Sequence, residues 1–169
     1  CNVEEIEKIG QQHKLNVIYD AAHCFGVKHN GESILKWGDL STLSFHATKV
    51  FHTIEGGAIY AKNPNIKEKI NNMINFGFSG KYEVDDLGFN GKLNEFEAIM
   101  GILNLEEIEK IIERRREIYN LYVEILTGLD VEFQRLTIND NEYNYSYFPI
   151  LFSTNEVKDK VFNKLIENN

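Results

Sequence analysis

The spacing of apolar and polar residues predicts strands and helices that alternate along the first half of the chain. Apolar side chains in residues 3–13 recur at helical intervals, and residues 15–19 form a short apolar run typical of a buried strand. Two further apolar runs, at residues 40–45 and 58–61, also predict strands, and residues 26–37 are expected to be a loop. This alternation predicts an α/β fold with a mostly parallel sheet. The short link before residue 58 favours an antiparallel orientation for that strand.

The second half of the chain is predicted to be mainly helical. Asn63 is the expected cap of a helix over residues 64–76, and the glycine-rich residues 77–91 are expected to be irregular. Apolar side chains at three- and four-residue intervals predict one long helix over residues 94–126. Beyond it, two strands and a helix are expected to form a small α+β subdomain: residues 131–133, 145–152 and 155–166.

Composition and charge narrow the function classes. The 169-residue chain is 43% apolar and 26% charged, which is ordinary for a globular protein. The formal net charge of −8 argues against a nucleic-acid surface, and the basic run Arg114 to Arg116 lies among glutamates on a predicted helix. No apolar stretch is long enough to span a membrane. Cys1 and Cys24 are too few for a disulfide framework, so a reducing cytoplasm is the expected location.

A lysine and an aspartate follow two of the predicted strands. Lys49 lies just beyond the strand at residues 40–45, before a Gly-Gly pair, and Asp20 ends the strand at residues 15–19. An amine held in such a turn can attack a carbonyl carbon, which is Schiff-base chemistry. Pyridoxal phosphate needs that amine together with a carboxylate that keeps its ring nitrogen protonated. The alternative is an ordinary exposed loop lysine and an aspartate that caps a helix.

Three ordered motifs carry a family resemblance. They are Asp20-Ala21-Ala22-His23, the run from Ser44 to Lys49 followed by Glu55-Gly56-Gly57, and the segment from Leu87 to Phe96. In this order they resemble the DegT/DnrJ/EryC1/StrS sugar aminotransferases, from about residue 17 to the end of the chain. The resemblance implies a pyridoxal-phosphate enzyme of the aspartate-aminotransferase fold type.

The resemblance also implies a role for each matching residue. Lys49 forms the Schiff base with pyridoxal 5'-phosphate and, once released, moves the proton during transfer. Asp20 pairs with the pyridine nitrogen, and His23 lies against the cofactor ring. Ser44 donates to the cofactor phosphate. Asn90 reaches the phosphate of the neighbouring subunit, which implies a homodimer with a shared active site.

Simpler interpretations remain open for these residues. His23 also fits a packed neutral histidine, Ser44 an ordinary strand serine, and Asn90 a turn residue between glycines. A metal site that combines His23 and Cys24 with His46 and His52 is not expected, because their spacing matches no standard zinc pattern.

The resemblance finally implies a domain organisation and a reaction. Residues 1–95 are expected to be the C-terminal part of a cofactor-binding large domain, residues 96–128 a long linking helix, and residues 129–169 a partial small subdomain. Family members are longer and carry a phosphate-binding loop before the aspartate motif, so residues 1–169 alone are expected to be inactive.

The implied reaction transfers an amino group from L-glutamate to a nucleotide-linked keto-deoxy sugar, for amino-sugar and surface-polysaccharide synthesis. The run Thr48-Lys49-Val50-Phe51 favours dTDP-4-keto-6-deoxyglucose as the acceptor. Two alternatives are an inactive fragment and a sensor or interaction domain that keeps the fold. A dehydratase of the same family is disfavoured, because such members replace the Schiff-base lysine.

Overall fold

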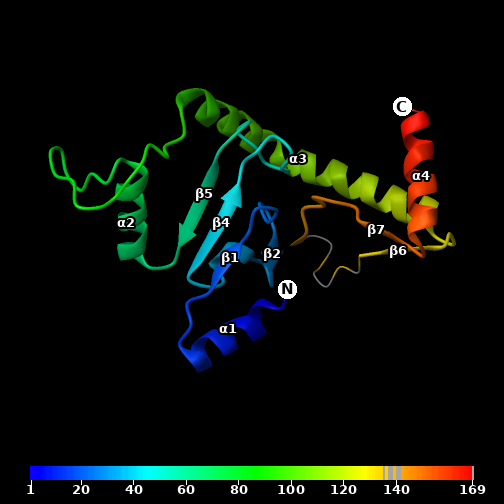
Figure 1. Cartoon of the computed structure of the whole chain (residues 1–169), viewed down its shortest axis with the longest axis horizontal. Coiled ribbons are helices and arrows are strands. Elements are labelled where there is room, and N and C mark those ends of the chain that lie inside the picture. Colours follow the sequence, from blue (N-terminus) through cyan, green and yellow to red (C-terminus); the bar gives the residue numbers. More distant parts are fainter. Residues whose placement is uncertain (135, 137–138, 140–141, 169) are drawn as a thin grey trace.

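A three-stranded mixed sheet lies at the centre of the computed structural model, which describes residues 1–134, 136, 139 and 142–168 (Figure 1). Its strands are β1 (Ile18–Asp20), β4 (Leu40–Ser44) and β5 (Gly57–Ala61). Strand β1 pairs with β4 in parallel, and β4 pairs with β5 antiparallel. The predicted α/β fold and the antiparallel third strand are therefore confirmed.

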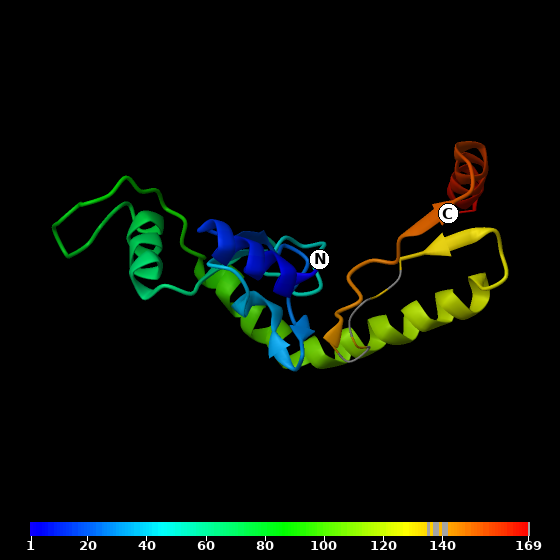
Figure 2. The same cartoon turned by 90° about the horizontal axis from the view of Figure 1, so that it is seen from below.

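Among the described residues, four α-helices surround and extend the sheet. They are α1 (Val3–His13), α2 (Pro64–Ile74), α3 (Glu95–Leu126) and α4 (Asn155–Glu167). Asn2, Asn63, Asn94 and Thr154 cap their first turns with side-chain oxygens, as polar residues at these positions favour. Seen from below, α3 passes under the sheet and continues to the C-terminal part of the chain (Figure 2).

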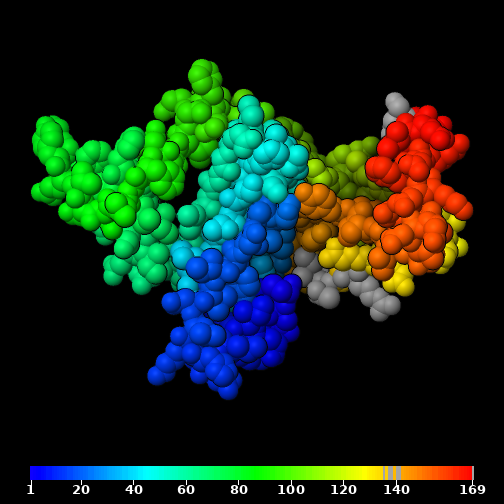
Figure 3. Space-filling model, in the orientation of Figure 1, coloured from blue at the N-terminus to red at the C-terminus, as the bar shows by residue number. Residues whose placement is uncertain are grey.

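Short strands complete the structure. Strands β6 (Val131–Phe133) and β7 (Ile150–Phe152) form an antiparallel pair that leads into α4. The space-filling view shows α2 and α4 projecting on opposite sides of the sheet (Figure 3). In the part of the chain that the structure describes, no helix combines the length and the apolar character that a membrane crossing requires.

Two sequence predictions of local structure are wrong. Residues 26–37 are not simply a loop, because they form the hairpin β2 (Lys28–His29) and β3 (Glu32–Ser33) and the short 3-10 helix η1 (Ile34–Lys36). The predicted strand at residues 145–152 is limited to β7. Tyr145 has a φ of 52°, which is incompatible with a strand, and Pro149 has no N–H for a ladder.

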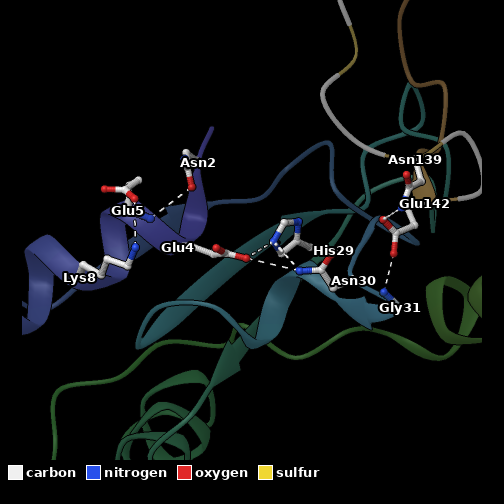
Figure 4. Close-up of polar contacts among 9 residues, drawn as sticks. All are labelled: Asn2, Glu4, Glu5, Lys8, His29, Asn30, Gly31, Asn139 and Glu142. Carbon is white, nitrogen blue, oxygen red and sulfur yellow. Dashed lines mark hydrogen bonds and ion pairs between the residues drawn. The ribbon is translucent and has the colours of Figure 1, made fainter.

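The β2–β3 hairpin is held from two sides (Figure 4). From α1, the Glu4 carboxylate lies 3.0 Å from His29 Nε2, and this hydrogen bond lowers the pKa of Glu4. From the other side, Glu142 accepts a hydrogen bond from the backbone N–H of Gly31. The hairpin therefore connects α1 with the segment that follows β6.

Three phenylalanine rings form the core beside the sheet. The rings of Phe25 and Phe51 stack with their centroids 4.1 Å apart, and Phe45 meets Phe51 edge-on at 4.9 Å. Phe45 and Phe51 are buried, and Phe25 is half-buried. Because Phe25 follows β1 and Phe51 follows β4, this cluster packs together the two loops that leave these strands.

We predict that Phe51→Ala lowers the free energy of unfolding of this chain by about 3–5 kcal/mol, since it removes a buried ring that its neighbours cannot replace. The matched control is Phe96→Ala, because Phe96 is 85% exposed and Phe51 only 4%. The control should change stability by less than about 0.5 kcal/mol. Denaturant titration monitored by circular dichroism measures both values, and equal effects would contradict the assignment of the core.

Candidate active site

The candidate site lies where β1 and β4 end. In their parallel pairing Asp20 is opposite Thr42, so both strands finish at the same edge of the sheet. Ligands of such sheets gather outside the carboxyl ends of the strands. Asp20 is the last residue of β1 and Ser44 the last residue of β4. Lys49 and His23 lie on the loops that follow.

The structure brings Lys49 and His23 into direct contact. Lys49 Nζ lies 3.3 Å from His23 Nε2 and 3.5 Å from His23 Nδ1. The two residues are 26 positions apart in the sequence, so the fold rather than local geometry creates the contact. Lys49 is half-buried and His23 is exposed, which leaves the pair on an open surface. A lysine amine in this position is accessible to a carbonyl compound.

Backbone hydrogen bonds fix the loop that carries Lys49. The N–H of Lys49 donates to the carbonyl of His46 at 2.9 Å, and the N–H of Thr53 donates back to the carbonyl of Phe45 at 2.9 Å. Buried Val50 and Phe51 anchor the loop directly after the lysine. The lysine therefore projects from a backbone that is fixed at both ends, instead of from a free tip.

Helix α3 supports the same loop from below. The amide Nδ2 of Asn104 donates to the carbonyl of His52 at 2.7 Å. Gly101 is buried, and a Cβ at this position would come within 3.0 Å of Thr53 Cγ2. A larger side chain at position 101 would therefore push α3 away from the loop that follows Lys49.

Asp20 and Ser44 have mostly local contacts. Asp20 Oδ1 accepts from the backbone N–H of Ala22 at 3.1 Å, which closes a local turn. Among the described residues no helix begins directly after Asp20, so the alternative of a helix cap is wrong. In the described part of the chain, Asp20 Oδ2 has no hydrogen-bond partner and remains available to a ring N–H. Ser44 Oγ accepts from the N–H of His46 at 3.4 Å, so its own hydroxyl hydrogen is available to an anion.

Asn90 is the predicted site residue that lies apart from this group. It forms an isolated bridge with Asn75 beyond the end of α2, and its Oδ1 accepts from Lys92 Nζ at 2.9 Å. Its predicted partner is the neighbouring subunit, so its role stays a prediction.

Three residues beside His23 are missing from the sequence prediction. Tyr147 meets the His23 ring edge-on, with centroids 4.9 Å apart. Asn144 and Ser146 contact the backbone carbonyl of His23. These residues follow His23 by more than 120 positions, and no spacing pattern in the sequence links the two segments.

The grouping fits pyridoxal phosphate. An amine, an imidazole, a carboxylate with an available oxygen and a hydroxyl lie at or just after the ends of β1 and β4, and these are the kinds of group that hold that cofactor. One hollow of about 570 Å³ lies between α3 and residues 145–148, with Tyr147 in its wall. The contact between Lys49 and His23 lies on an open surface, with Lys49 half-buried and His23 exposed.

Cys24, next to His23, has a thiol that the fold makes less reactive. Burial raises its pKa, and the nearby negative charge of Asp20 acts in the same direction. Cys1 is exposed.

We therefore predict that iodoacetamide alkylates Cys1 at least about ten times faster than Cys24 at pH 8, because only thiolate reacts. Peptide mass spectrometry over time measures the two rates. In denaturant the difference should largely disappear, and equal rates in the folded protein would contradict the described burial.

Comparison with solved structures shows which enzymes share this fold. DesI, solved in the presence of its TDP-sugar product, matches 90% of this chain and 39% of its own length with a TM-score of 0.80 and 29% identity. GDP-4-keto-6-deoxy-D-mannose-3-dehydratase from E. coli, solved with bound hydrated PLP, matches with a TM-score of 0.87. It is 17% identical over 99% of this chain and 48% of its own, which shows a shared fold alone. The chain therefore has the fold that DesI and this dehydratase share.

Sequence comparison identifies the family. Residues 1–169 match the model of the DegT/DnrJ/EryC1/StrS aminotransferase family, and the chain belongs to that family. The dTDP-4-amino-4,6-dideoxy-D-glucose transaminase of Shigella dysenteriae is 40% identical over 174 residues. That match covers 100% of this chain and 47% of the relative. The chain thus spans about half the length of this relative.

Proposed function

We propose that the protein carrying this chain is a pyridoxal-phosphate-dependent aminotransferase that acts on a nucleotide-linked keto-deoxy sugar. L-glutamate is the proposed amino donor. The Shigella relative's name supports dTDP-4-keto-6-deoxyglucose as the acceptor and carbon 4 as the aminated position. The observation that carries the proposal is the contact of 3.3 Å between Lys49 Nζ and His23 Nε2, at the sheet edge where Asp20 ends β1.

The proposed roles are those that the family resemblance implies, and the geometry of the chain supports them. Pyridoxal phosphate, when bound, supplies an aromatic ring that accepts electrons. Lys49 binds the cofactor through its amine and later moves a proton from a loop whose backbone is fixed on both sides. Asp20 holds a proton on the ring nitrogen with its available oxygen. Ser44 donates its hydroxyl to the phosphate from the end of β4.

A homodimer with a shared active site is part of the proposal. In it, Asn90 contacts the cofactor phosphate of the partner subunit. The support is that Asn90 pairs with Asn75 beyond α2 and that no contact in the described part of the chain joins it to Lys49 or His23. A site completed from another subunit also agrees with the open surface around the lysine.

The fold alone does not select the reaction, since the E. coli dehydratase shares it. The family resemblance implies that the residue at position 49 distinguishes the two reactions, amino transfer and dehydration. A lysine there supports amino transfer, whereas its replacement supports dehydration. Lys49 therefore favours the transaminase. A sensor domain that has lost catalysis is the second alternative, and covalent attachment of the cofactor distinguishes it from an enzyme.

We predict that Lys49→Ala abolishes covalent attachment of pyridoxal phosphate and lowers transamination by at least about 10²–10⁴-fold. Attachment is measured by mass spectrometry after borohydride reduction of the complete protein that carries this chain. The matched control is Lys62→Ala, because Lys62 is an exposed lysine that pairs with Glu7 on α1. Labelling that persists in Lys49→Ala would disprove the assignment.

We predict that Asp20→Asn keeps the cofactor on Lys49 but lowers kcat by about 10²-fold or more, since a neutral amide no longer favours the protonated ring. Steady-state kinetics and the borohydride assay together measure the two effects. Asp130→Asn, an exposed aspartate in the turn before β6, is the control. Unchanged kcat in Asp20→Asn would leave the aspartate with only its hydrogen bond in the turn at Ala22.

A further inference from the structure

One buried amide joins the C-terminal part of the chain to the loop of His23. Asn144 is only 1% exposed, and its Nδ2 donates to the carbonyls of His23 and Phe25, both at 2.8 Å. Its Oδ1 accepts from the backbone N–H of Ser146 at 3.3 Å. The nitrogen and the oxygen of its side-chain amide therefore both have partners, and the two bonds from Nδ2 hold the backbone of residues 23–25.

The orientation of this amide is fixed by its surroundings. The amide nitrogen faces two carbonyl oxygens, and Oδ1 faces an N–H, so exchanging the two ends would leave oxygen against oxygen. Ser146 Oγ lies 2.7 Å from Asn144 Oδ1 and 3.2 Å from the carbonyl of His23. Its single hydrogen serves one of these acceptors, and the shorter contact is to Asn144.

The loop itself does not satisfy these carbonyls. Between β1 and β2 the backbone turns use the carbonyls of Ala21 and Cys24, which accept from the N–H groups of Cys24 and Val27. The carbonyls of His23 and Phe25 are left for Asn144. The segment that carries Asn144 is itself held by α3, because Arg115 Nη1 lies 3.3 Å from the carbonyls of Tyr145 and Ser146.

We infer that Asn144 and Ser146 are positioning residues for the contact between His23 and Lys49, an inference that rests on the proposed function. We call these two side chains, with the carbonyls of His23 and Phe25, the Asn144 clamp. The clamp fixes the backbone at His23, and the edge of Tyr147 packs against its ring from the same segment. His23 is thereby held within 3.3 Å of the amine that binds the cofactor.

The sharpest test is Asn144→Asp, which keeps the shape of the side chain and removes both donors. In the complete protein that carries this chain, freed of cofactor, hydrogen exchange of peptides covering residues 21–27 should accelerate at least about tenfold, because two buried carbonyls lose their partner. The rate of borohydride-trapped cofactor attachment to Lys49 should fall in parallel. Exchange in β5 should stay unchanged.

A milder variant and a matched control keep the test decisive if Asn144→Asp does not fold. Ser146→Ala should accelerate exchange of residues 21–27 by about twofold to tenfold, the range of one neutral hydrogen bond. Ser41→Ala is the control, because Ser41 is also 1% exposed and bonds to a carbonyl, that of Leu35. It should leave residues 21–27 and cofactor attachment unchanged.

The possible outcomes separate the two proposals. Unchanged exchange and attachment in Ser146→Ala and in a folded Asn144→Asp would overturn the clamp, while attachment to Lys49 in the wild type would still support the proposed function. Absence of attachment in the wild type would overturn the proposed function, and the exchange rates would still decide whether the clamp holds the loop. Faster exchange with unchanged attachment would also overturn the positioning role, because it would leave the clamp purely structural.

Discussion

The parallel pairing of β1 with β4 is the constraint on which the candidate site depends. It places Asp20 opposite Thr42, so the ends of both strands and the loops after them emerge at one edge. The stacked rings of Phe25 and Phe51 then join these two loops. A register shift of one residue would reverse which side chains of β1 face the core and would separate the lysine from the histidine.

The site also depends on residues far along the chain. Two side-chain amides bond to the loops that follow β1 and β4. Asn104, on α3, donates to the carbonyl of His52, and Asn144, in the segment after β6, donates to those of His23 and Phe25. A buried carbonyl without a partner costs about 1–3 kcal/mol, so each loop is more stable with α3 and its following segment in place. The lysine and the histidine thus belong to separate loops whose positions the C-terminal part controls.

Sequence reasoning predicted the elements better than their contacts. Helix periodicity predicted α1 to α4, and Asn63 was the expected cap of α2, because such signals act within a few residues. The hairpin β2–β3 was missed, since its strands are two residues long and too short for periodicity. Lys49 and Asp20 were proposed as site residues because their residue types follow apolar runs, and their roles stay predictions. Asn144 carries no such signal, since its role arises from a contact 121 positions away.

The distribution of exposure around the site has a physical reason. A lysine that must react with an incoming aldehyde needs an accessible amine, yet its backbone must stay fixed so that the amine points one way. The chain meets both needs by separating them within the loop: Val50 and Phe51 are buried, whereas Lys49 stays half-buried. His23 follows the same arrangement, with an exposed ring and a carbonyl held by a buried amide. In the proposed site, rigidity therefore lies in the backbone, and the proposed reactivity lies in two side chains on the open edge.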